Sequence, residues 1–116
     1  MMDVIYESVR ESAFGLSMDA IWQHMSVDFS SSFNDGLDRV ETFFLLMKEL
    51  MVQGDIKLAR DGVLLSGSIE DQLRALRSSW PKNPGEDDLD GFGLWFLTEA
   101  PVGIVWISRE GKEIWT

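Results

Sequence analysis

The chain is 116 residues long, contains no cysteine and has a formal net charge of −10. This length suits one domain over residues 1–116 with one modest hydrophobic core. Without cysteine there is no disulfide, thiolate catalysis or cysteine zinc site, and the negative charge opposes binding to nucleic acid or anionic membranes. The N-terminus has no basic segment and the longest apolar run, 43–47, is short. We therefore expect neither a signal peptide nor a membrane span, and a cytoplasmic protein.

The N-terminal half is predicted to be mostly helical. A first helix is expected over 3–14, with an irregular apolar stripe of Val4 or Ile5, Val9 (or Ser8) and Phe14, and Gly15 as its C-terminal stop. Ser17 is a candidate N-cap for a second, short helix that continues to about Met25.

The third helix has the clearest apolar periodicity in the chain. Apolar residues recur at spacings of three and four from Leu37 to Met51, with Asp35 or Asp38 at the start and Gly54 at the end. The pattern then alternates over 55–59, turns at 60–62 and resumes at 63–65, which predicts a β-hairpin with Asp-Gly in the turn.

The last part of the chain is predicted to contain one more helix and three strands. Ser68 and Asp71 approximate a capping box for a fourth helix over 69–79. Strands are expected over 92–98, 102–108 and 112–116, the second central because it is apolar on both faces. The predicted fold class is therefore α+β: a helical N-terminal half with a short hairpin, then a C-terminal antiparallel meander packed on the helices.

Catalytic and cofactor motifs are absent from the sequence. No phosphate-binding glycine loop, dinucleotide fingerprint, nucleophile elbow or HExxH pattern is present, and no cofactor or metal is predicted. His24, the only histidine, lies near Asp28 and Asp19 and could act with a carboxylate as a general base. No nucleophile stands at a recognisable spacing from it, so a structural or exposed histidine is the favoured interpretation.

An acidic loop is the densest charge cluster in the sequence. Glu86, Asp87, Asp88 and Asp90 precede the aromatic residues Phe92 and Trp95. Three interpretations are open: a solvated loop, a docking surface for a basic partner, and a hard-cation site. The EF-hand ligand pattern is absent, which weighs against the cation. As a docking surface, the carboxylates would form the rim and the two aromatic rings the anchors.

Several stretches resemble a small bacterial family of unknown function, the domain-of-unknown-function family 596. The resemblance covers nearly the whole chain and rests on residues 54–62, 67–72, 94–96, 101–106 and 113–116. It implies no established activity and no catalytic residues. Small acidic proteins of this kind are often encoded beside polymorphic or contact-dependent toxins, which implies an immunity role.

Together these features favour a non-enzymatic protein-binding module, most concretely an immunity protein that neutralises a basic toxin domain. A nuclease toxin is basic because it holds phosphates, so an acidic inhibitor can compete for the same surface. The alternatives are a self-associating structural protein, with a twofold homodimer as its default state, and a small enzyme that uses His24 with a carboxylate.

Overall fold

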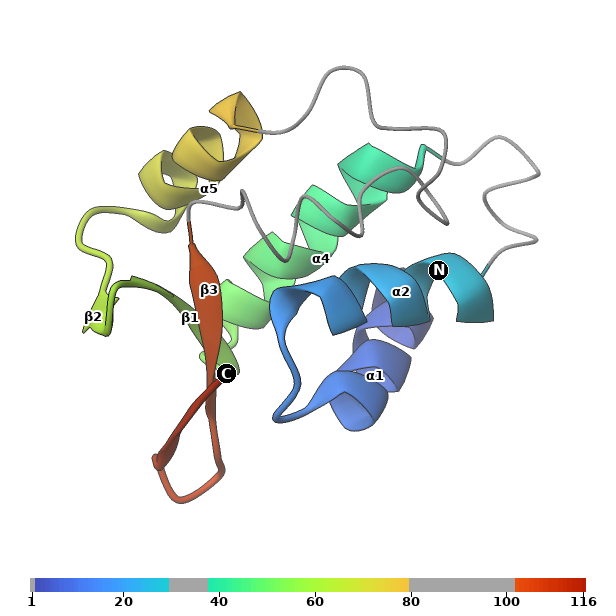
Figure 1. The fold of residues 1–116 in the computed structure, drawn as a ribbon. Helices are drawn as coiled ribbons and strands as arrows, with labels where there is room; N and C mark the ends of the chain where they lie inside the picture. The colour runs from blue at the N-terminus through green and yellow to red at the C-terminus, as the bar shows by residue number, and fades with distance from the viewer. Residues whose placement is uncertain (1, 30–37, 80–101) are drawn as a thin grey trace.

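The computed structural model describes residues 2–29, 38–79 and 102–116 and contains four helices and four strands in these ranges. In chain order they are α1 (Met2–Ala13), α2 (Met18–Asp28), α4 (Arg39–Val52), β1 (Ile56–Arg60), β2 (Val63–Leu64), α5 (Ile69–Ser78), β3 (Gly103–Ile107) and β4 (Glu113–Trp115). Figure 1 shows the helices gathered around α4 and the strands at one side of them. The predicted α+β fold class is thus confirmed.

The helices begin where side chains can satisfy their first backbone N–H groups. Asp38 caps α4 by accepting a hydrogen bond from the Glu41 N–H at 2.9 Å. Ser68 caps α5 by accepting from the Asp71 N–H at 3.1 Å. Such caps satisfy donors that have no partner inside the helix. Ser17 is the N-cap residue of α2, but its hydroxyl donates to Asp19 instead of accepting from the helix backbone.

The end of α4 sets the start of the sheet. Gly54 has a φ of +81°, its N–H donates to the Met51 carbonyl, and the Asp55 N–H donates to the Leu50 carbonyl. This pair of bonds is the Schellman arrangement, which favours glycine because the left-handed conformation is strained for other residues. The chain therefore leaves α4 with Asp55 held against the helix end, and β1 begins at the next residue.

The four strands form one antiparallel sheet in the order β2-β1-β3-β4. The β1–β2 hairpin turns at Asp61 and Gly62, which both have positive φ, as a type I′ turn requires. β3 lies between β1 and β4, so its predicted central position is confirmed. The sequence prediction kept the first hairpin apart from the C-terminal strands, whereas the structure joins them through the β1–β3 pairing, in which Leu58 lies opposite Ile104.

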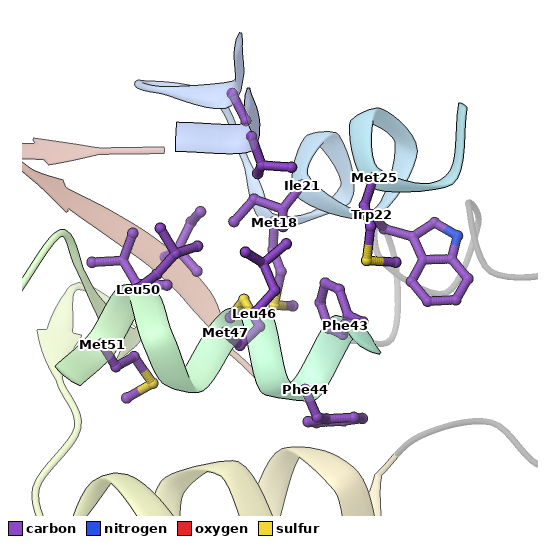
Figure 2. Close-up of a cluster of buried hydrophobic side chains, with 14 of the residues drawn as sticks. Met18, Ile21, Trp22, Met25, Phe43, Phe44, Leu46, Met47, Leu50 and Met51 are labelled. Atoms are coloured by element: carbon purple, nitrogen blue, oxygen red, sulfur yellow. The ribbon is translucent and has the colours of Figure 1, made fainter. Parts of the chain in front are cut away.

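The hydrophobic core lies between the helices and the inner face of the sheet. Figure 2 shows Phe43 and Leu46 of α4 directed toward α2, while Phe44 points toward α5 on the opposite side. Trp22 meets Phe43 edge to face, with ring centroids 5.5 Å apart, a geometry that aromatic rings prefer. Helix α4 is the central element because it is apolar on both of these sides.

The apolar stripe of α1 differs in part from the prediction. Its buried residues are Ile5, Val9 and Ala13, while Val4 and Phe14 are exposed. The helix ends at Ala13, one residue before the predicted end, so Phe14 belongs to the turn into Gly15 and no longer follows the helical period.

Candidate partner-binding cleft

The acidic loop proposed from the sequence lies outside the described residues. This applies to all six residues of the predicted docking surface: Glu86, Asp87, Asp88, Asp90, Phe92 and Trp95. The strand predicted over 92–98 lies outside them as well. Their role remains a prediction from the sequence.

His24 lies on α2 and is partly exposed. Its Nδ1 is 3.9 Å from Asp28 Oδ2, one helical turn later, which is longer than a hydrogen bond. Within the described residues His24 makes no hydrogen bond to any carboxylate. Among the described residues, Asp28 is thus within ion-pair range of His24 but does not orient the imidazole by a hydrogen bond, and the enzymatic alternative stays a hypothesis.

A cleft of about 550 Å³ lies between α1 and the β3–β4 hairpin. We call it the α1–β3 cleft. It is lined by side chains from three segments that are far apart in the sequence: residues 7–14 on α1 and its C-terminal turn, Asp55 after α4, and residues 106–110 of β3 and the following turn. Because three elements meet here, each wall is set by a different local structure.

The α1 wall is an acidic stripe. Glu7 and Glu11 are four residues apart and exposed, so they lie on the same face of the helix, and Asp3 continues this stripe by another turn. The buried face of the same helix, with Ile5 and Val9, packs against the core. The amphipathic pattern of α1 thus orients its carboxylates toward the cleft and solvent.

The base of the cleft is tied together by Asp55. This carboxylate is only 15% exposed, lies 3.2 Å from the Arg10 guanidinium, and accepts a hydrogen bond from the Tyr6 hydroxyl. Partial burial and this hydrogen bond raise the pKa of Tyr6 to about 12. Since both partners of Asp55 come from α1, the cluster fixes that helix against the junction of α4 and β1.

Phe14 forms an exposed aromatic wall. Its ring is 43% exposed and packs on Trp106, with centroids 5.4 Å apart. The Trp106 indole N–H donates to the Leu16 carbonyl at 2.8 Å. The buried indole therefore holds the turn after α1, and this turn keeps Phe14 at the mouth of the cleft.

The third wall is the turn between β3 and β4. Ser108 and Lys112 close it with two hydrogen bonds, from the Ser108 N–H to the Lys112 carbonyl at 2.9 Å and from the Lys112 N–H to the Ser108 hydroxyl at 3.0 Å. Gly111 takes a φ of +82° inside the turn. This bonding holds Glu110 at the tip of a well-defined loop.

Carboxylates exceed guanidinium groups along the α1–β3 cleft. Four acidic side chains line it against two basic ones, and Arg10 is already paired with Asp55. Within the described residues, Glu11 and Glu110 form no ion pair. An exposed ring beside an excess of carboxylates is suited to receive a basic, partly apolar surface.

The described residues form neither a cluster of metal-ligating side chains nor a membrane-spanning helix. No three histidine, aspartate or glutamate side chains converge there to hold a metal ion. Across the same ranges, no helix is both long enough and apolar enough to cross a membrane.

The sequence prediction did not include any residue of this cleft. The spacing of Asp3, Glu7 and Glu11 was available as a signal of an acidic helix face. No comparable signal indicates that residues 106–110 lie beside α1, because that proximity depends on the pairing of β1 with β3.

The fold and the cleft together define a small α+β domain with an acidic cleft at one end of its sheet. The family described as a protein of unknown function, DUF596, matches residues 51–116, and the chain belongs to this family. A solved structure described as an uncharacterized protein conserved in bacteria, from Neisseria meningitidis, is 34% identical, with a TM-score of 0.77 over 97% of this chain and 87% of that chain. No curated protein matches the chain. The resemblance seen in the sequence is thereby confirmed.

Proposed function

We propose that this protein is a non-enzymatic, cytoplasmic protein-binding module that binds a basic partner, most concretely as an immunity protein that neutralises a basic toxin domain. One observation carries the proposal: the α1–β3 cleft combines the exposed Phe14 ring with Glu11 and Glu110, which form no ion pair within the described residues, in a chain with a net charge of −10. Acidic rims accelerate encounter with basic proteins, and aromatic residues near the centre of an interface contribute much of the binding free energy.

Each wall of the cleft has a separate part in this proposal. Glu11 and Glu110 supply the negative field that attracts a lysine- or arginine-rich surface. Phe14 supplies the apolar contact that holds the complex once it forms. Asp55 and Arg10 already neutralise each other, so they contribute little to the attraction of a basic partner. Their ion pair instead holds α1 against the junction of α4 and β1.

The first experiment is capture of partners from the native host with the wild-type protein and with Phe14→Ala in parallel. Only proteins that are lost with Phe14→Ala count as ligands of the cleft. For a purified ligand, we expect this variant to bind at least about tenfold more weakly, as at an interface hot spot. Val27→Ala is the matched control, because Val27 is exposed on α2 and does not line the cleft.

A second variant tests the acidic loop as a separate surface. Glu86, Asp87, Asp88 and Asp90 are changed together to their amides, and the rate of association with the same purified ligand is measured. If the loop forms part of the rim, association slows in this variant as well. Unchanged kinetics would remove the loop from the interface. A ligand that is acidic, or a capture experiment in which every basic partner is recovered equally with Phe14→Ala, would contradict the cleft.

A further inference from the structure

One exposed stripe on α4 is apolar at both ends and charged at its centre. Leu45 and Val52 are 55% and 56% exposed, although they belong to the most buried helix of the molecule. Lys48 and Glu49 lie between them and are exposed as well. Spacings of three, four and seven residues place all four side chains on one face of the helix. We call these four residues the α4 stripe.

The stripe is complementary to itself in antiparallel orientation. A twofold axis that crosses α4 between residues 48 and 49 places Leu45 opposite Val52 of a second copy. The same axis places Lys48 opposite Glu49 of that copy, and each contact occurs twice. A twofold interface must be self-complementary in this manner, because the same patch meets itself.

The charges beside the stripe also permit self-association. Lys48 lies 3.5 Å from Glu70 of α5, and Arg77 forms two hydrogen bonds to Glu41, at 2.7 and 3.0 Å. Arg74 lies 3.2 Å from Asp71. Counting Glu49 of the stripe, three cations lie on this side against four carboxylates, so the face is much closer to neutral than the chain with its overall charge of −10, and two copies meet less repulsion here than the net charge implies.

The groove between α4 and α5 extends the apolar contact. It has a volume of about 350 Å³, and its lining includes Leu45, Phe44 and Leu73. We infer that two copies of this chain associate through their antiparallel α4 stripes, as a twofold homodimer. The contact of one helix pair falls among the small interfaces, below about 1,200 Å² of total buried area, so the dimer is weak and depends on concentration.

Charge reversal tests the register of this dimer. Sedimentation velocity is measured over a concentration series for the wild type, Lys48→Glu, Glu49→Lys and the double variant. Each single reversal replaces two attractive pairs across the axis by two repulsive ones, so dimerisation weakens by about tenfold. Lys48→Glu also loses the ion pair with Glu70 of its own chain, so Glu49→Lys is the cleaner of the two single variants. The double variant restores opposite charges and returns the dissociation constant to within about threefold of wild type.

Two further variants separate the interface from effects on the fold. Leu45→Glu touches no ion pair and must also weaken the dimer, whereas Lys57→Glu, on an exposed strand position outside the stripe, must not. A wild type that stays monomeric at millimolar concentration overturns the inference. So does a double variant that associates no better than the single ones. The stripe and the α1–β3 cleft share no residue. A failure of the dimer proposal can therefore be distinguished from a failure of the partner-binding proposal.

Discussion

At the scale of single residues, Tyr6 has the most perturbed environment among the described residues. It is the only tyrosine in the chain, so phenolate absorbance reports on it alone. Its partial burial and its hydrogen bond to Asp55 favour the neutral phenol and raise its pKa to about 12. We expect an alkaline ultraviolet titration of the folded protein to show a midpoint near 12. A midpoint near the ordinary value of 10.0 would contradict this environment.

The same pKa predicts how stability depends on pH. Because the folded pKa of Tyr6 lies above the unfolded one, its contribution is fully present below pH 10 and is lost as the pH rises toward 12. The comparison is the free energy of unfolding of wild type minus that of Tyr6→Phe. We expect this difference to be about 1 kcal/mol at neutral pH and to shrink over that window. A difference that stays constant would show that the hydrogen bond to Asp55 does not form.

Ser26 is a second residue whose environment makes a prediction. It lies on α2, is only 8% exposed, and its hydroxyl has no hydrogen-bond partner in the described part of the chain. Ser26→Ala removes an unsatisfied buried oxygen and adds helix propensity, so we expect the free energy of unfolding to rise by about 0.5–1.5 kcal/mol. Ser12→Ala on α1 is the control, because Ser12 is exposed and gains propensity alone. Loss of stability in Ser26→Ala would mean that the hydroxyl is satisfied.

At the scale of elements, local signals predicted the starts of α4 and α5, the end of α4 and the first hairpin, whereas α2 continues to Asp28, three residues beyond the predicted end at about Met25. Asp38 and Ser68 cap α4 and α5, and Gly54 ends α4. Each of these helix boundaries is determined by one residue type and by its hydrogen bonds to backbone atoms three to five positions away along the chain. The end of α1 was harder to place, because Phe14 continues the apolar spacing although Gly15 has already broken the helix.

The β1–β2 turn offers a test of this local reasoning. Gly62 has a φ of +81°, where an alanine side chain is strained. Gly62→Ala is therefore expected to lower the free energy of unfolding by about 1–2 kcal/mol. Gly103→Ala is the matched control, since an added Cβ there meets nothing within 4 Å and no positive φ is required. We expect that variant to be neutral or slightly more stable, and equal losses in both would contradict the turn.

At the scale of the whole molecule, the sequence could predict the fold class but not the cleft. Strand pairing between β1 and β3 joins residues about 45 positions apart, and no local pattern encodes that distance. The approach of Glu110 to Glu11 depends on this pairing and on the Asp55 cluster. The net charge, by contrast, is visible in the sequence at once, and it pointed to the same chemistry of partner.

The molecule as a whole carries two surfaces of different character. The α1–β3 cleft has an excess of carboxylates around Phe14, whereas the α4 stripe carries one cation and one anion at its centre and an exposed apolar side chain at each end. They share no residue, so a dimer formed through α4 leaves the acidic cleft of each copy with its own set of side chains.

The rate of association with a purified basic ligand, measured across ionic strengths, tests the central claim most directly. If the cleft carboxylates attract the ligand, the wild-type rate falls about tenfold or more as salt is raised from low to high concentration. Glu11→Gln with Glu110→Gln then binds more slowly at low salt and responds less to added salt, while its dissociation rate changes little. Association rates of wild type and variant that coincide at every ionic strength would contradict the acidic cleft as the binding surface.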